Sequence, residues 1–199
     1  DVMKSLKVLS AGLVLTAGIF LSSFVWADDY AIDKNHSTIG FSVKHMMVSK
    51  TSGVFKDYDG TIKFDPNDLA GSKIEMTVQA ASIDTRMDKR DEHLKGSEFL
   101  DATKFPAMTF VTKSIAKDGE GYNLTGDLTI KGVTKEITIP AEISGPVNSP
   151  MGGTVIGIDA NFKINRQDYG VSFNKVMDNG GLMVSDDVNV DVSFEAGKK

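Results

Sequence analysis

The sequence predicts an all-β protein built on one antiparallel sheet. Eight segments alternate apolar and polar residues, which is the pattern of strands with one buried face. Most of them are joined by short connections rich in Gly, Pro, Asn or Asp, as in hairpin turns. Only residues 86–106 have the character of a helix. Because helices alternate with strands in α/β folds, a single helical excursion favours an antiparallel sheet.

An apolar leader precedes the predicted sheet. Two lysines come before an apolar run over residues 8–26, and Val25-Trp26-Ala27 is typical of a signal-peptidase site. The run lies at the lower limit of the ~17–25 residues that span a bilayer, so a retained anchor is the alternative. Since no charged flank follows the run, we expect residues 1–27 to be a cleaved signal peptide and residues 28–199 to be a single domain.

The first three predicted strands cover residues 30–45, 54–64 and 72–83, before the helical stretch. Asp59-Gly60 bends the second of them, and Pro66-Asn67-Asp68 turns the chain into the third. Alternation places one apolar row of each strand on the same side of the sheet. The inward residues of this half that we expect to line the interior are Ile39, Phe41, Val43, Phe64, Met76 and Val78.

The helical stretch is predicted to be a plug at about residues 86–101. Its helix covers residues 87–95, with Asp84 or Thr85 placed to cap the start and Gly96 to end it, and a second brief turn begins at Ser97. The residues spaced to share one face of this helix are Met87, Arg90, Asp91 and Leu94. We expect this mixed face to lie across the sheet or to close the end of a barrel.

Five more strands follow, over residues 107–115, 122–130, 133–143, 154–165 and 187–195. Asp118-Gly119 and Lys131-Gly132 are predicted hairpin turns, whereas residues 166–185 read as an irregular crossing. Alternation is most regular in residues 154–165. The expected interior residues of this half are Met108, Phe110, Leu128, Ile139, Ile158, Ala160, Phe162 and Val190.

Eight antiparallel strands with one apolar face can close into a barrel or stack as a sandwich. A closed barrel of this size has an interior that is either filled by side chains or holds one small ligand. Gly126, Ala141 and Ala160 lie among larger inward residues, and these small side chains favour a cavity.

Composition excludes several classes of function. The chain has 22 Lys and Arg against 27 Asp and Glu, a formal net charge of −5. This balance argues against nucleic acid as a partner, because phosphate backbones are bound by concentrated positive charge. Cys is absent, which excludes disulfides, thiolate chemistry and a lipidated N-terminal cysteine. We therefore expect an exported chain that is soluble once the leader is removed.

Five pieces of the sequence, in chain order, resemble the YceI family. They are residues 33–37 (DKNHS) with 41–45 (FSVKH), 53–55 (GVF), 90–94 (RDEHL), 126–135 (GDLTIKGVTK) and 165–170 (NRQDYG). The resemblance covers residues 29–196 and implies an extended, lipocalin-like, eight-stranded antiparallel barrel. It also implies a periplasmic, non-enzymatic protein that binds a long-chain amphiphile such as a polyisoprenoid, an isoprenoid quinone or a fatty-acid-like lipid. It leaves open the native lipid and the choice among carriage, storage and stress protection.

A metal-dependent or hydrolytic enzyme is the first alternative. His36 and His45 lie nine apart in one predicted strand and would face opposite ways, and His93 has no ligand-type residue one helical turn away. The chain has no G-x-S-x-G turn. We expect no catalytic residue, no metal and no cofactor apart from a bound lipid. The enzyme alternative would use an inward His45 together with carboxylates.

A ligand-free structural or stress protein is the second alternative. It predicts a packed interior and an exposed apolar patch, whereas the outward strand positions are polar. The methionines are compatible with ordinary core packing and with a flexible wall around an apolar chain. We expect membrane association to be transient at most, and a homodimer stays open.

Three polar residues are candidates for contact with a ligand head group. His45 shares the parity of Phe41 and Val43, so it lies inward at a strand end, either as a hydrogen-bonded rim residue or as a head-group contact. Arg90 and Asp91 carry the same two interpretations, and an anchor that holds the plug is favoured.

Overall fold

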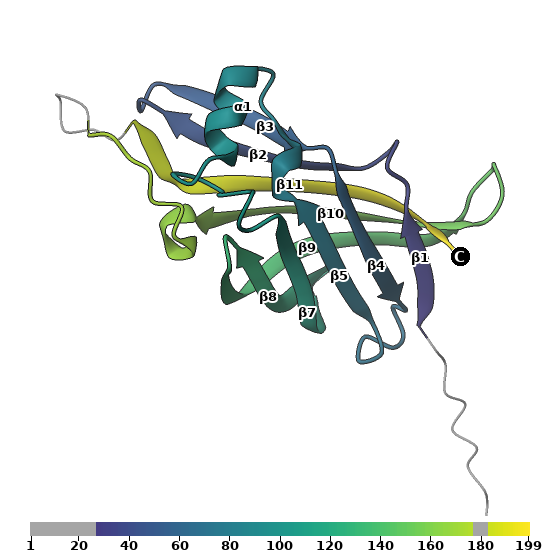
Figure 1. Ribbon diagram of the computed structural model, residues 1–199. Coiled ribbons are helices and arrows are strands. Elements are labelled where there is room, and N and C mark those ends of the chain that lie inside the picture. Colours follow the sequence, from purple (N-terminus) through teal and green to yellow (C-terminus); the bar gives the residue numbers. More distant parts are fainter. Residues whose placement is uncertain (1–26, 177–182) are drawn as a thin grey trace, which may run out of the picture.

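The computed structural model describes residues 27–176 and 183–199, so the predicted signal peptide lies, except for Ala27, outside the described residues. The described residues form one antiparallel sheet that closes on itself as a barrel, with a single α-helix at one end (Figure 1). Within these residues, no helix has both the length and the apolar character needed to cross a bilayer.

The barrel contains eight strand positions in the order β1-β4-β5-β7-β8-β9-β10-β11, and β1 closes the ring by pairing with β11. The strands β2 and β3, and the short β6, extend the ring beyond β11. The strand bounds are β1 Asp28–Ile32, β2 Thr38–His45, β3 Ser49–Phe55, β4 Tyr58–Phe64, β5 Lys73–Gln79, β6 Ile83–Asp84, β7 Ala107–Asp118, β8 Gly121–Ile130, β9 Val133–Asn148, β10 Thr154–Asn165 and β11 Val184–Lys198.

Three of the barrel strands are interrupted, which explains how eleven segments make an eight-stranded ring. β11 pairs with β1 near its C-terminal end and with β2 along the rest of its length. β1 and β2 together therefore occupy one position of the ring. In the next position β4 pairs with β1 and β3 pairs with β2, and in the third β5 pairs with β4 and β6 pairs with β3. The predicted eight-stranded antiparallel barrel is confirmed.

The single strand predicted over residues 30–45 is wrong, because residues 33–37 form a turn between β1 and β2. The Asp33 carboxylate accepts the backbone N–H of Asn35 at 2.9 Å, which is an Asx turn. The Asp33 N–H donates to the carbonyl oxygen of Glu195 at 2.8 Å and ties this turn to β11. The strand predicted over residues 54–64 is likewise two strands, and β3 begins five residues earlier than predicted.

The α-helix α1 covers Asp88–Lys95 and contacts β6, the short strand that pairs with β3 (Figure 1). Its N-cap residue is Met87, with no side-chain cap, so the capping predicted for Asp84 or Thr85 is wrong. Gly96 ends the helix, as predicted. The second turn at Ser97 is a hydrogen-bonded turn rather than a helix. Two 3-10 helices complete the helical segments, η1 Ala80–Ser82 and η2 Arg166–Tyr169.

The hydrophobic core fills the end of the barrel opposite α1. Tyr30, Ile62, Phe64 and Ile156 are almost fully buried there, and the ring of Phe64 meets that of Tyr122 edge to face at 5.5 Å. Phe64 was predicted to line a ligand site, but it belongs to this packed end. These buried side chains belong to one contiguous hydrophobic core.

Gly126 does not leave space for a ligand. A Cβ atom added at Gly126 would lie 2.4 Å from the carbonyl oxygen of Val111, so the glycine allows β7 and β8 to approach each other closely. Ala141 is buried in the packed core. Of the three small residues that favoured a cavity in the sequence, Ala160 alone lines it.

Candidate binding cavity

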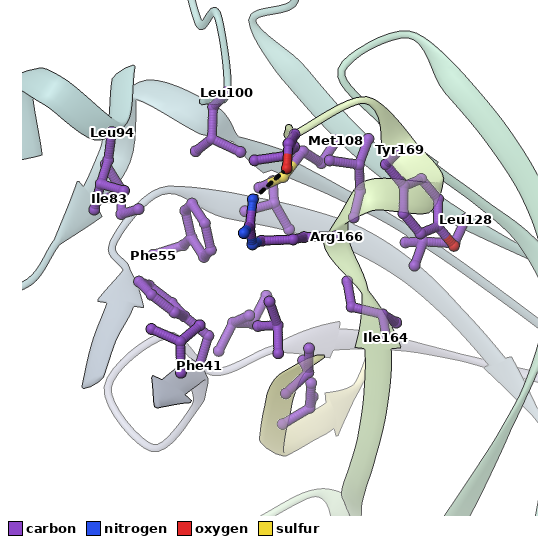
Figure 2. A pocket seen from close by; sticks show the side chains of 18 of the residues that line it. Phe41, Phe55, Ile83, Leu94, Leu100, Met108, Leu128, Ile164, Arg166 and Tyr169 are labelled. Atoms are coloured by element: carbon purple, nitrogen blue, oxygen red, sulfur yellow. Dashed lines mark hydrogen bonds between the residues drawn. The ribbon is translucent and has the colours of Figure 1, made fainter. Parts of the chain in front are cut away.

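A cavity of about 450 Å³ occupies the half of the barrel next to α1 and is partly open to solvent. Its walls are the inward faces of the long strands together with α1 and the segments that follow α1 and η2 (Figure 2). This volume is in the range of small-molecule sites. The lining side chains are mostly aliphatic, aromatic or methionine.

All but one of the residues predicted to face the interior line this cavity. They are Ile39, Phe41, Val43, Met76, Val78, Met108, Phe110, Leu128, Ile139, Ile158, Ala160, Phe162 and Val190. The exception is Phe64, which lies in the packed end of the barrel. Strand alternation located these residues because inward and outward positions differ by one residue along every strand.

Three rings, those of His93, Phe99 and Phe173, pack together at the α1 end of the cavity. The imidazole of His93 lies edge-on to the rings of Phe99 and Phe173, with ring centroids 5.0 and 5.2 Å away. The two phenylalanine rings are 4.7 Å apart. His93 also pairs with the Glu98 carboxylate at 2.8 Å. The sequence showed His93 only as a rejected metal ligand, whereas the structure places it in the cavity wall.

Arg90 and Asp91 bind Thr85, the residue that follows β6. The Thr85 hydroxyl donates to the Asp91 carboxylate and accepts from the Nε of Arg90 at 2.7 Å. The Nη2 of Arg90 donates to the Thr85 carbonyl oxygen at 2.7 Å. Asp91 is buried and does not line the cavity, whereas Arg90 does. Asp91 is therefore placed as an anchor for α1, and Arg90 is both an anchor and part of the wall.

His45 lies at the end of β2 and lines the cavity. Its carbonyl oxygen accepts the Val48 N–H at 3.2 Å, which closes the β2–β3 hairpin. Its imidazole makes no hydrogen bond to any residue in the described ranges. The imidazole is therefore a polar group of the cavity wall.

Arg166 is a cavity-lining cation that the sequence analysis did not select. Figure 2 shows Arg166 in the cavity wall; it is only 5% exposed. Its guanidinium donates to the carbonyl oxygens of Val171 at 2.6 Å and Ser185 at 2.9 Å. It also pairs with the Asp186 carboxylate at 3.1 Å. Burial lowers the pKa of Arg166 from its ordinary value, and Asp186 partly opposes this change. The sequence did contain a signal for this position. Arg166 comes two residues after the inward-facing Ile164, so strand alternation points it the same way.

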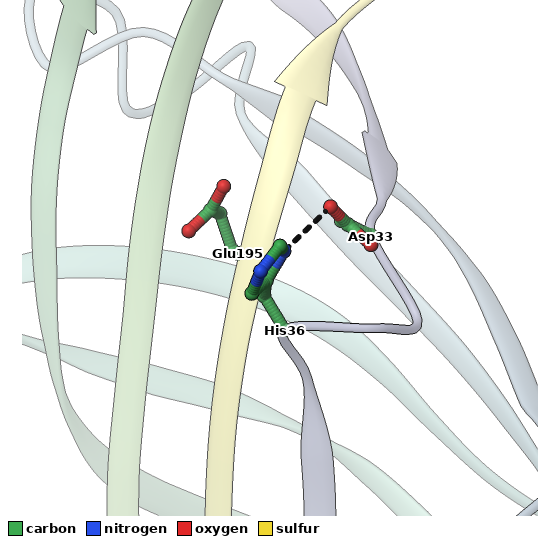
Figure 3. Close-up of side chains that lie close together, drawn as sticks. All are labelled: Asp33, His36 and Glu195. Atoms are coloured by element: carbon green, nitrogen blue, oxygen red, sulfur yellow. Dashed lines mark hydrogen bonds and ion pairs between the residues drawn. The ribbon is translucent and has the colours of Figure 1, made fainter. Parts of the chain in front are cut away.

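Asp33, His36 and Glu195 form a cluster on the barrel surface, away from the cavity (Figure 3). Their ligand-type atoms lie within 4.8 Å of one another, and His36 Nδ1 is 2.9 Å from Asp33 Oδ2. An imidazole with two carboxylates is a donor set that divalent metal ions accept. His36 and His45 do not share one strand as predicted, since His36 lies in the turn before β2. Glu195 is brought in by β11, which local sequence does not show.

The polar side chains of the cavity wall are few and lie mainly toward α1. They are His45, Thr51, Thr85, Arg90, His93, Thr109, Arg166 and Tyr169. The opposite part of the wall is apolar. This division suits an amphiphile whose apolar chain lies deep in the barrel and whose polar group faces the α1 end.

Comparison with known proteins gives consistent matches. The model of the YceI-like domain matches residues 30–196. Protein YceI of Shigella flexneri is 39% identical over 162 residues, which cover 80% of this chain and 85% of that protein. The crystal structure of Burkholderia cenocepacia BcnA, 29% identical, has a TM-score of 0.73 and covers 82% of this chain and 98% of its own. A polyisoprenoid binding domain from Saccharophagus degradans shares the fold, with a TM-score of 0.61 at 15% identity and coverage of 85% and 98%.

Proposed function

The chain belongs to the YceI-like domain family, and we propose that it is a non-enzymatic binding protein that holds a long-chain amphiphile inside its barrel. The observation that carries the proposal is the cavity itself. It is closed at one end by a packed hydrophobic core and walled mostly by apolar side chains, and its few polar groups lie mainly toward α1.

The physical gain from such binding is large. Removing a few hundred Å² of apolar ligand surface from water at ~25 cal/mol/Å² gives on the order of 10 kcal/mol before the entropic cost of binding is subtracted. This attraction does not distinguish among similar chains, so selection would fall to the polar groups at the α1 end. We propose His45 and Arg90 for that role, because both line the cavity.

The proposed ligand class is a polyisoprenoid, an isoprenoid quinone or a fatty-acid-like lipid. The polyisoprenoid binding domain of Saccharophagus degradans is a precedent for such a ligand in a barrel of this fold. We place the protein in the periplasm, where a carrier or store would keep an insoluble molecule away from water after residues 1–27 are removed. The predicted leader supports this location.

The identifying experiment is organic extraction of protein purified from its own compartment, followed by mass spectrometry of the extract and metal analysis of the protein. The expected result is one class of long-chain lipid in near-stoichiometric amount. An extract without lipid, from protein that carries one metal ion per chain, would contradict the proposal and favour the metal-dependent alternative.

A further inference from the structure

The β2–β3 hairpin ends in three successive exposed apolar residues. Met46, Met47 and Val48 are 43%, 59% and 87% exposed. Exposed apolar side chains are ordinary when scattered, but a contiguous group of them indicates an interaction site. Nothing within the described residues buries this group.

The backbone at Met46 and Met47 has a conformation that is unfavourable for methionine. Met46 and Met47 both have positive φ angles, 52° and 62°, and the Val48 N–H donates to the His45 carbonyl oxygen across them. Two central residues with positive φ are typical of a type I′ turn, for which Asn-Gly is preferred. Methionine adopts this conformation at an energetic cost. Since both methionines remain exposed, at 43% and 59%, burial in the core does not explain them.

The neighbouring segment extends the same surface. The Met46 N–H donates to the Met183 carbonyl oxygen at 2.8 Å, and the Met183 N–H donates to that of Lys175 at 2.9 Å. Lys175 is followed by Val176, whose side chain is exposed. His45 and Met183 also line the cavity, so the hairpin end lies at the cavity's border. We call Met46, Met47, Val48 and Val176 the tip surface.

Lysines flank the tip surface. Lys44 and Lys50 are exposed and face each other directly across the hairpin, and Lys175 lies on the adjoining segment. None of the three has an ion-pair partner in the part of the chain that the structure covers. Like charges opposite each other across two strands repel. The arrangement therefore fits an anionic partner that relieves the repulsion.

We propose that the tip surface docks on an anionic lipid bilayer, with the apolar hairpin end among the acyl chains and the flanking lysines on the lipid phosphates. Apolar residues flanked by lysines are the general pattern of interfacial membrane anchors. The tip surface is one hairpin end and a neighbouring valine, which is small for the ~1,000 Å² that a stable protein interface needs. Docking here would bring the border of the cavity to the membrane. Membrane docking is separate from lipid binding inside the barrel, and it can be measured with protein that holds no bound lipid.

The test is co-sedimentation of the purified protein with vesicles of phosphatidylcholine alone or mixed with phosphatidylglycerol. The critical variant is Met46→Asn/Met47→Gly, which removes the apolar side chains and supplies the preferred turn sequence. It should fold with equal or higher thermal stability and bind phosphatidylglycerol vesicles roughly ten-fold more weakly. Lys44→Gln and Lys50→Gln should each weaken that binding roughly five-fold, with no effect on phosphatidylcholine vesicles.

The matched control is Met151→Ser. Met151 is 97% exposed in the β9–β10 loop at the opposite end of the barrel, so this variant removes a comparable apolar side chain and should bind vesicles like the wild type. Wild-type protein that does not sediment with phosphatidylglycerol vesicles would overturn the proposal. So would a tip variant that still binds them. Loss of a dimer in the tip variant, with vesicle binding unchanged, would make the hairpin a self-association surface instead.

Discussion

Asp91 accepts two hydrogen bonds from Thr85, one from the hydroxyl and one from the backbone N–H at 2.9 Å. Both residues are buried, and they join the first turn of α1 to the segment that follows β6. Because a buried donor without a partner loses its hydration with no compensation, moving α1 away from Thr85 would be costly, and the pair therefore fixes the position of the helix.

Asp91→Ala should destabilise the protein by about 2–3 kcal/mol, since it leaves two buried Thr85 donors without an acceptor. Urea unfolding measures the change in free energy, and hydrogen exchange should show α1 as the region that loses protection. The control is the exposed neighbour Glu92→Ala, which should change stability by less than about 0.5 kcal/mol. An Asp91→Ala protein as stable as this control would show that the Asp91–Thr85 pair does not anchor α1.

Arg166→Met should cost about 2–4 kcal/mol, because the carbonyl oxygens of Val171 and Ser185 and the Asp186 carboxylate lose a buried donor. Lys163→Met is the matched control, since Lys163, three residues earlier in β10, pairs at the surface with Asp187 of β11 at 3.3 Å. Such an exposed pair contributes about 0–1 kcal/mol. Equal losses of unfolding free energy for the two variants would show that the Arg166 network is unimportant for the fold.

The Asp33–His36 pair should make stability depend on pH. The hydrogen bond with Asp33 raises the pKa of His36 above its ordinary 6.5, and the same contact lowers the pKa of Asp33 below its ordinary 3.8. The raised imidazole pKa contributes stability that is fully present below 6.5 and lost as pH rises through the folded-state value. The lowered carboxylate pKa contributes stability that is present above 3.8 and lost as pH falls through its folded-state value.

The pair's contribution should therefore be greatest near about pH 5. The measurement is the difference in unfolding free energy between wild type and His36→Asn at a series of pH values. This difference should be largest near about pH 5 and should shrink toward about pH 9. Both side chains are exposed, so the effect is small and salt-sensitive. A difference that stays constant across this range would contradict the assignment.

The fold and the cavity wall were predictable because both depend on strand alternation. Ile158, Ala160 and Phe162 follow one another at the spacing that a half-buried strand imposes, and the structure places all three in the wall. Local signals also located the α1 C-terminus at Gly96. The predictions were wrong where the hydrogen bond of one side chain overrides the local strand or helix-capping pattern. Asp33 breaks a strand by accepting a nearby N–H, and the Asp91–Thr85 bond replaces the predicted cap.

Two features required contacts between distant parts of the chain. Glu195 joins Asp33 and His36 only because β11 closes the barrel against β1. The packed end that contains Phe64 is indistinguishable from the cavity end in the sequence, since both use the same inward positions of the same kind of strand. Arg166 was accessible in principle, because the inward parity of β10 continues to it. It was not predicted, because the sequence pattern places residues 166–185 in an irregular crossing beyond the strand.

We propose that the interior next to Ala160 is a ligand cavity and not an ordinary core. The most direct measurement is native mass spectrometry of Ala160→Trp, with urea unfolding in parallel and Asn161→Trp as the control on the outward face of the same strand. A hollow barrel predicts that Ala160→Trp keeps wild-type stability and loses most of its bound lipid, while Asn161→Trp retains both. An Ala160→Trp protein that is destabilised by about 1–3 kcal/mol through overpacking and still carries lipid at the wild-type level would contradict the claim.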